Sequence, residues 1–260
     1  MSGSYTSHAV VLRWRSYGES DKIVTFLTRD FGKLTGIGKG AKNSRKRFPN
    51  SLEILARVQV QFRQRQEASL AFLESCELLG PRAAPMDPER LAYGAYLTEL
   101  AEQMTVEWSP ALSTYELLDE ALRSLEEGPA TAALLRAYEL KLLECAGFAT
   151  PLDHCCECGT TLANPDTPEI FFAPSAGSFC CMGCGHRREG LQHDGLQAIS
   201  AELVARLRTL RQMPLQRGCE NSLGPQRDTA AQITGQLLAL HLIRPLQSTR
   251  TIEQLTRSRS

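Results

Sequence analysis

The chain has 260 residues, equal numbers of basic and acidic side chains (29 each) and nine cysteines. This length allows two or three compact units with a buried core. Residues 1–8 lack the apolar stretch of a signal peptide, and no apolar run approaches the ~18 residues of a membrane span, so we expect a cytoplasmic protein with reduced thiols and no membrane contact. Residues 1–80 hold 13 Lys and Arg against 7 Asp and Glu, which favours phosphate-bearing partners.

Five short runs with the composition of β-strands fall within the first eighty residues. The fourth, residues 52–62, has apolar side chains at every second position, as a half-buried strand does: Ile54, Ala56, Val58, Val60 and Phe62. Five such strands in about 75 residues have the size and rhythm of a closed Greek-key barrel of the OB type. We therefore predict an OB-fold domain over residues 1–82.

A segment rich in glycine and cations separates the third run from the fourth. Its glycines do not form the G-x-x-x-x-G-K-[ST] pattern of a nucleotide loop, but its five cations could neutralise several phosphates of a nucleic-acid backbone. Tyr17 and Phe48 stand beside turns and are the preferred candidates for stacking on unpaired bases. The predicted DNA-binding residues are Arg13, Lys33, Lys39, Lys42, Arg45, Lys46, Arg47, Arg57 and Arg63.

Helical patterns follow the predicted barrel. Asp87-Pro88-Glu89 has the residues of a helix start, and Ser113-Thr114-Tyr115-Glu116 has those of a capping box. Apolar stripes then predict further helices over 130–146, 196–210 and about 233–240. We expect one helical domain in two parts, residues 83–150 and 191–246. A disordered tail, residues 247–260, is expected to follow it.

Two C-x-x-C-G motifs interrupt the helical domain, at Cys155–Gly159 and at Cys181–Gly185, with 22 residues between Cys158 and Cys181. Paired thiolates at this spacing are typical of tetrahedral zinc sites. The predicted ligands of one structural zinc ion are Cys155, Cys158, Cys181 and Cys184. Because four thiolates fill the coordination sphere, no position is left for an activated water. The expected zinc module spans residues 151–190.

Other residues near the two motifs leave the ligand register open. Cys156 and Cys180 each adjoin a predicted ligand and could compete for the metal, and His154 and His186 flank the motifs. No H-x-E, H-E-x-x-H or G-x-S-x-G motif occurs in the sequence. We therefore expect no enzymatic activity. The fold class expected is α+β multidomain: an N-terminal OB-type β-barrel followed by an α-helical domain with an inserted four-cysteine zinc module.

The order of several short motifs resembles the RecO family of DNA repair and recombination mediators. In the first part of the chain the similar segments are Val11-Leu12-Arg13, Tyr17 to Asp21, Leu27-Thr28, Gly32-Lys33-Leu34 and Gly38 to Lys42. In the second part they are Tyr138 to Leu143, Gly147-Phe148, Pro151 and the four predicted zinc ligands. Each motif is short, but their shared order covers most of the chain.

The resemblance implies an accessory protein of homologous recombination in the RecF pathway, located in the cytoplasm with the nucleoid. RecO-like proteins bind single- and double-stranded DNA, anneal complementary strands and work with the RecR protein. They help RecA replace single-strand-binding protein, whose acidic C-terminal tail some of them bind. The main alternative from the residues alone is an RNA- or ribosome-associated protein with an OB fold and a zinc ribbon. A preference for RNA over single-stranded DNA would identify that alternative, since the 2′-OH distinguishes the two. Two further alternatives are an enzyme with a zinc-stabilised fold and a zinc-stabilised scaffold without affinity for nucleic acid.

Overall fold

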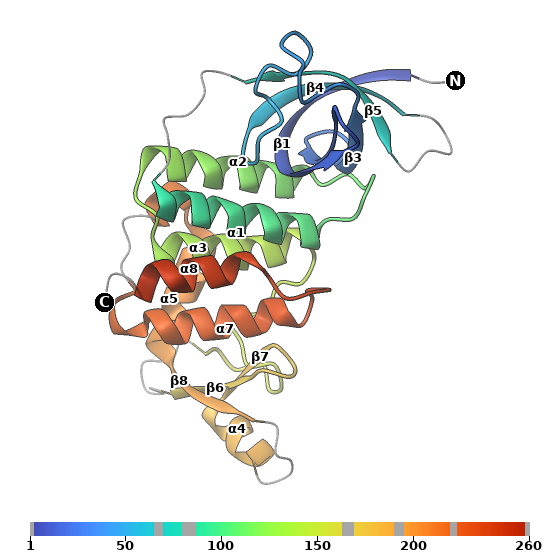
Figure 1. Ribbon diagram of the computed structural model, residues 1–260. Coiled ribbons are helices and arrows are strands. Elements are labelled where there is room, and N and C mark those ends of the chain that lie inside the picture. Colours follow the sequence, from blue (N-terminus) through green and yellow to red (C-terminus); the bar gives the residue numbers. More distant parts are fainter. Residues whose placement is uncertain are drawn as a thin grey trace. The chain divides into compact units, whose positions relative to one another are not determined.

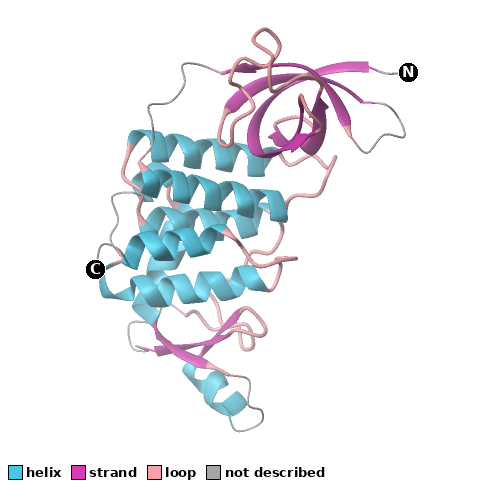
Figure 2. Cartoon of the chain, in the orientation of Figure 1, coloured by secondary structure: helices cyan, strands magenta, loops and turns pink. Residues whose placement is uncertain are grey.

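The computed structural model describes residues 3–64, 70–79, 87–162, 169–189, 195–218 and 223–257. The chain forms two compact units. Unit 1 consists of Met1–Glu127 and Leu246–Ser260, and unit 2 of Gly128–Pro245. Figure 1 labels the elements and Figure 2 colours them by type. The domain boundaries that we predict after residues 82 and 190 lie outside the described residues and stay predictions.

Five strands of unit 1 close into a barrel, as the sequence predicts. They are β1 (Gly3–Tyr17), β2 (Asp21–Thr28), β3 (Gly32–Gly38), β4 (Arg57–Gln64) and β5 (Ala71–Leu78). Their order around the barrel is β1-β2-β3-β5-β4, and β4 pairs with β1 to close it. β3 and β5 are parallel, and the other neighbouring strands are antiparallel. This strand-rich N-terminal unit is OB-like, which confirms the predicted fold class.

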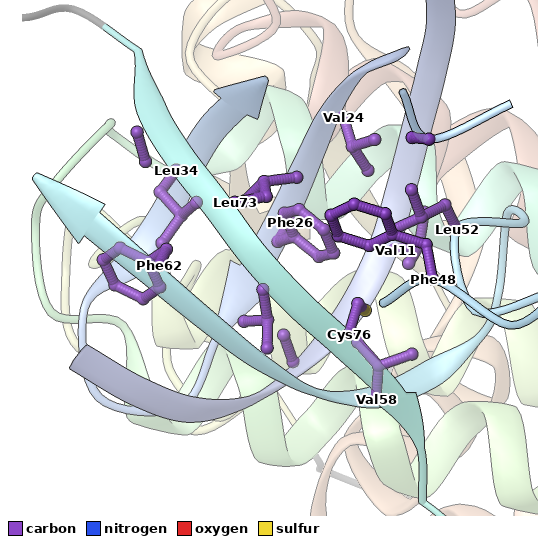
Figure 3. Packing of buried hydrophobic residues seen from close by; sticks show 14 residues of the cluster. Val11, Val24, Phe26, Leu34, Phe48, Leu52, Val58, Phe62, Leu73 and Cys76 are labelled. Atoms are coloured by element: carbon purple, nitrogen blue, oxygen red, sulfur yellow. The ribbon is translucent and has the colours of Figure 1, made fainter. Parts of the chain in front are cut away.

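The barrel core contains the apolar side chains of the alternating strands (Figure 3). In β4 the alternation holds: Val58, Val60 and Phe62 are fully buried, and the residues between them are exposed. Phe48 is also buried in this core, so the prediction that it stacks on bases is wrong. The loop that carries Phe48 folds back over the barrel, and burial of its ring removes a large apolar surface from water.

The fourth strand begins later than its sequence pattern indicates, at Arg57 and not near residue 52. The backbone N–H of Val11 donates to the Ala56 carbonyl at 2.9 Å, and the N–H of Leu55 donates to the Val11 carbonyl at 3.0 Å. Leu55 has a φ of 71°, and Ile54 is 48% exposed. Residues 51–56 therefore form a turn against β1. The alternating sequence pattern starts in this turn, several residues before the strand itself.

Three helices complete unit 1: α1 (Pro88–Met104), α2 (Leu112–Glu127) and α8 (Ser248–Arg257). The Asp87 side chain accepts hydrogen bonds from the N–H groups of Glu89 and Arg90, both at 3.0 Å, which confirms the predicted cap. The capping box expected at Ser113 does not form. The N–H of Tyr115 donates to the Ala111 carbonyl, so the helix starts earlier and Ser113 lies within its first turn.

In the C-terminal segment 247–260, the described residues 247–257 are not the disordered tail that the composition predicts, and residues 258–260 lie outside the described residues. Residues Ser248–Arg257 form α8, which packs against α1 (Figure 1). Glu99 of α1 caps α8: its carboxylate accepts from the N–H of Gln247 at 2.9 Å, the N–H of Ser248 at 2.9 Å and the Ser248 hydroxyl at 2.6 Å. A partner 148 residues away in the sequence provides this cap, and local composition does not encode it.

We expect the change Glu99→Ala to release α8 from α1. Loss of a helix cap costs about 1 kcal/mol, so trypsin should cut faster after Arg250 and the free energy of unfolding should fall by a similar amount. Glu116→Ala, an exposed acid on α2, is the matched control and should change neither. Equal cleavage rates in the Glu99 variant and the wild type would show that the cap does not hold α8.

Unit 2 combines helices with a small sheet. Its helices are α3 (Ala132–Cys145), α4 (Met182–Glu189), α5 (Ala201–Gln212), α6 (Leu215–Gly218), the 3-10 turn η1 (Gly224–Gln226) and α7 (Arg227–Ala239). Its strands, in the order β7-β6-β8, are β6 (Glu169–Ala173), β7 (Ser178–Cys181) and β8 (Gln197–Ser200). α3 is central and contacts α5, α6 and α7.

The helix predicted over 196–210 begins only at residue 201. Ile199 lies in β8 and pairs with Ile170 of β6. The Ser200 hydroxyl then accepts from the N–H of Leu203 at 3.2 Å and caps α5. The spacing of Leu196 and Ile199 continues the apolar stripe of the helix and so extends the predicted range. In the structure, pairing with β6 makes this segment a strand, and the Ser200 cap starts the helix after it.

Candidate nucleic-acid interface and metal centre

The first candidate site is the cationic loop, which we define as residues 39–47 with their five Lys and Arg side chains. The turn between β1 and β2 holds this loop in place. Asp21 accepts from the N–H of Gly40 at 2.8 Å and from Lys39 Nζ at 2.7 Å. Lys42 donates through its N–H to the Ser20 carbonyl and through Nζ to the Gly18 carbonyl, both at 2.9 Å. The loop therefore presents its cations on an ordered backbone.

The charges of the loop are only partly compensated. The hydrogen bond from Lys39, followed by that from Gly40, holds the pKa of the Asp21 carboxyl below its ordinary value, and Asp21 in turn raises the pKa of Lys39. Both groups are therefore charged at neutral pH. In the described part of the chain, no hydrogen bond or ion pair engages the exposed side chains of Arg45 and Lys46. Among the described residues, four of the five cations therefore have no acidic partner of the kind that Lys39 has.

The backbone of the loop is also tied to the barrel at its far end. The N–H of Cys76 in β5 donates to the Arg47 carbonyl at 2.8 Å. The Arg47 guanidinium reaches back across the loop and donates to the Lys39 carbonyl. The Arg47 residue as a whole is exposed. Arg47 therefore closes the loop on itself while keeping its charge at the surface.

One exposed aromatic ring lies beside the cationic loop. Tyr17 ends β1, is 51% exposed, and has Lys39 Nζ 6.0 Å from its ring centroid. By contrast, Lys22 Nζ lies 3.9 Å from the ring centroid of Trp14, which itself packs against the barrel core. Of the two stacking candidates from the sequence, only Tyr17 offers a ring face to solvent. This surface therefore combines a half-exposed ring with a set of exposed cations.

The other predicted DNA-binding residues have partners outside this loop. Arg13 Nε donates to Glu102 Oε1 at 2.5 Å, and Lys33 Nζ donates to the Glu102 carbonyl at 2.6 Å. Both contacts join the barrel to α1 within unit 1. Strand position does not reveal such pairing, because the acceptor lies 69 to 89 residues further along the chain.

Arg57 and Arg63 likewise have acidic partners. Arg57 Nη2 donates to Glu126 Oε2 at 2.5 Å, and its Nη1 lies 3.7 Å from Asp119 Oδ1 of the same helix α2. Arg63 forms an ion pair with Glu74 on the neighbouring strand β5. Sequence reasoning missed Asp21 as the residue that organises the loop, and its only signal was an acidic residue where the turn after β1 meets β2.

The second candidate site is the four-thiol group of Cys155, Cys158, Cys181 and Cys184. All four Sγ atoms lie within 4.8 Å of one another, and those of Cys158 and Cys181 are 3.7 Å apart. A tetrahedral ion with Zn–S bonds of about 2.3 Å would separate its sulfurs by about 3.8 Å. The four cysteines could therefore hold a metal ion, and among the described residues neither the two flanking histidines nor Cys156 and Cys180 belong to this group.

Local structure brings the four sulfurs together in two turns. In the first, the N–H of Gly159 donates to the Cys155 carbonyl at 3.1 Å, and Gly159 has the positive φ of 71° that glycine adopts freely. In the second, Cys181 ends β7 and Cys184 lies in the first turn of α4. Gly185 is required there for space, because a Cβ would lie 2.1 Å from the Phe171 ring.

The thiols differ in how readily they ionise. The Thr160 hydroxyl, 3.2 Å from Cys158 Sγ, and the Thr160 backbone lower the pKa of Cys158 to about 6. Burial raises the pKa of Cys184, while the guanidinium of Arg187 donates to its Sγ at 2.8 Å. A bound dication favours the thiolate of every ligand. The donor set therefore suits a thiophilic metal such as zinc.

Two family models match the chain over almost its full length. Residues 1–82 match the N-terminal model of recombination protein O, and residues 85–250 match its C-terminal model. The first covers the barrel, and the second covers the segment from the start of α1 into α8. In the described part of the chain, no helix is long and apolar enough to cross a membrane.

Curated proteins with similar sequences agree with these matches. The chain is 37% identical over 178 residues to the DNA repair protein RecO of Syntrophus aciditrophicus (strain SB), which covers 68% of each chain. It is 32% identical over 246 residues to the DNA repair protein RecO of Myxococcus xanthus (strain DK1622), which covers 94% of this chain and 95% of the relative. A third such protein, from Syntrophotalea carbinolica, is 30% identical over 96% of this chain and 95% of its own length.

Proposed function

This chain belongs to the recombination protein O (RecO) family of DNA repair proteins, and we propose on that premise that it anneals complementary DNA strands as an accessory of homologous recombination. It binds single- and double-stranded DNA and helps load RecA onto DNA coated by single-strand-binding protein. The observation that carries this proposal is the cationic loop, an ordered segment of the barrel whose cations lie at the surface.

The loop lowers the repulsion between two DNA backbones. Strand pairing brings two polyanions together, and cations that contact both replace condensed counterions. Complementary base pairing provides the sequence specificity, so the surface needs no base-edge contacts. No covalent step is required. Arg13, Lys33 and Arg57 take part less directly in this proposal. Carboxylates of α1 and α2 engage Arg13 and Arg57, and Lys33 donates to the backbone carbonyl of Glu102.

Tyr17 contributes the contact that distinguishes unpaired from paired bases. Its half-exposed ring lies beside Lys39, and an aromatic face next to a cationic track is the arrangement with which OB barrels bind single strands. A base in duplex DNA is already stacked and gains little from this ring. Tyr17 therefore favours single strands, while the cations serve both forms.

The change Tyr17→Ala should weaken binding of an oligo(dT) strand by about tenfold, because stacking on one aromatic ring contributes ~1–3 kcal/mol. Tyr17→Phe keeps the ring and should bind as the wild type does, and Phe148→Ala removes a comparably exposed ring of unit 2 as a control. The measurement is fluorescence anisotropy with oligo(dT) and with a strand of abasic sites. A loss of equal size on the abasic strand would contradict base stacking.

One structural zinc ion is the cofactor that we propose for the four-thiol group. The ion would be held by Cys155, Cys158, Cys181 and Cys184 and would fix the turn before Gly159 to the end of β7. When bound, it supplies folding free energy and no chemistry, since four thiolates leave no open position. The short sulfur separations and the lowered pKa of Cys158 support this assignment.

The partners of the proposed activity are the RecR protein and the acidic C-terminal tail of single-strand-binding protein. Family membership supports both, and we assign neither to a residue. The proposed location is the cytoplasm, in association with the nucleoid. Binding to RecR and to a peptide of that tail can be measured separately from DNA binding, so a failure of one does not decide the others.

The decisive experiment is the annealing of two complementary labelled oligonucleotides, bare or coated with single-strand-binding protein, over a series of salt concentrations. We expect acceleration that persists on coated strands and falls steeply as salt rises. Equal strands of RNA test the alternative of an RNA-associated protein. No acceleration at low salt by folded, metal-loaded protein would overturn the proposal.

A further inference from the structure

Cys156 and Cys180 form a second thiol pair, separate from the four-thiol group. Their Sγ atoms are 3.0 Å apart, about 1 Å longer than the ~2.05 Å of a disulfide bond. Neither sulfur belongs to the group that could hold a metal ion. The separation of the two sets follows from the fold, because residues adjacent in a strand or turn point their side chains in different directions.

The backbone holds this pair in register. The N–H of Cys156 donates to the carbonyl of Phe179, the residue before Cys180, at 2.9 Å. Cys180 itself lies within β7 and pairs with Phe171 of β6. The two thiols therefore lie on segments that are already hydrogen-bonded to each other. A small movement of the side chains would bring the two sulfurs within the length of a disulfide bond.

The two thiols differ in access to solvent. Cys156 is exposed, whereas Cys180 is fully buried. Exposed and buried partners at this distance suit thiol–disulfide exchange, in which the accessible sulfur reacts with the external oxidant and the inaccessible one resolves the product. We propose that Cys156 and Cys180 are a redox-reversible dithiol that forms an intramolecular disulfide beside the metal centre when a small-molecule disulfide is the oxidant.

The exchange balances in two steps. The Cys156 thiolate attacks one sulfur of the small-molecule disulfide, which forms a mixed disulfide and releases one thiolate. The Cys180 thiolate then attacks Cys156 Sγ, which forms the protein disulfide and releases the second thiolate. The two protons from the cysteines go to the two released thiolates. The protein loses two electrons, and the oxidant gains them.

The product joins the same two segments that the proposed zinc ion joins, namely the turn before Gly159 and the strand β7. Oxidation thus provides a second cross-link that does not use the four thiols of the metal centre. When zinc is removed under oxidising conditions, the disulfide should therefore keep the turn before Gly159 joined to β7. Zinc occupancy and oxidation of this pair are expected to be independent of each other.

The test uses the full-length, zinc-loaded protein incubated with oxidised glutathione, followed by thiol alkylation, proteolysis and mass spectrometry. We expect one Cys156–Cys180 cross-link per chain with no loss of zinc. Cys180→Ala should stop at the glutathione adduct on Cys156, and Cys156→Ser should give neither adduct nor cross-link. Cys145→Ser, a change of a half-buried cysteine outside both sets, is the control and should behave as the wild type does.

Three results would overturn the proposal. The first is the absence of the cross-link in folded wild-type protein. The second is a cross-link of undiminished yield in Cys180→Ala, which would mean that another thiol resolves the adduct. The third is release of zinc in proportion to oxidation, which would mean that the metal ligands themselves are oxidised. None of these results bears on DNA annealing, so the proposed function is tested separately.

Discussion

Replacing Lys42, Arg45, Lys46 and Arg47 with alanine should reduce the affinity for single-stranded DNA on the order of a hundredfold at about 0.1 M salt. Each lost phosphate contact on a single strand makes the slope of log K against log salt shallower by about 0.7, so four lost contacts should change it by about 3. Annealing should fall in parallel. The measurement is a salt titration of binding and of annealing rate with the same oligonucleotides.

Two variants make this result specific. The double change Arg45→Ala and Lys46→Ala removes side chains that have no hydrogen bond in the described part of the chain, so the fold should be intact and the slope should change by about half as much. The charge-matched control removes four exposed arginines of unit 2: Arg206, Arg217, Arg227 and Arg244. Equal losses in the control and the loop variant would show that net charge, and not the loop, determines binding.

The change Cys184→Ser should abolish tight metal binding and destabilise unit 2. Metal binding provides about 10 kcal/mol or more of folding free energy in small zinc modules, and serine is a poor substitute for a buried thiolate. We expect less than one zinc per chain by metal analysis and a lower melting temperature of unit 2. A chelator should produce the same change in the wild type under reducing conditions.

The matched control for this prediction is Cys145→Ser, which changes a half-buried cysteine outside the four-thiol group. It should keep one zinc per chain. Binding of DNA should persist in Cys184→Ser, because the cationic loop belongs to unit 1. Full zinc occupancy and an unchanged melting temperature in Cys184→Ser would rule out the proposed ligand set.

Local patterns account for the parts of the fold that the sequence predicted correctly. Alternation marks Val58, Val60 and Phe62 as core residues because a strand exposes successive side chains on opposite faces. Asp87 before Pro88 marks the start of α1, because the aspartate accepts from unpaired N–H groups and the proline lacks an N–H that would be unpaired there. The C-x-x-C spacing likewise acts within a single turn. In each case the interacting groups are a few residues apart.

Two of the incorrect predictions concern contacts between distant residues. The segment after Pro245 reads as disordered, but its residues Ser248–Arg257 form α8, which Glu99 caps. Phe48 stands beside a turn in the sequence, but its loop folds back into the barrel core. Neither contact leaves a mark in the local composition, because the partner residue belongs to another element.

The sequence by itself determined the barrel, the paired cysteines and the presence of a basic segment, since periodicity and spacing act over one turn or one strand. Only the tertiary structure decided which cations remain available. It pairs Arg13 and Arg57 with Glu102 and Glu126 on helices far along the chain, and leaves Arg45 and Lys46 exposed. It also sets Cys156 against Cys180 and apart from the four-thiol group. The physical reason is that the state of a charge or a thiol depends on its neighbours in space, which chain order does not specify.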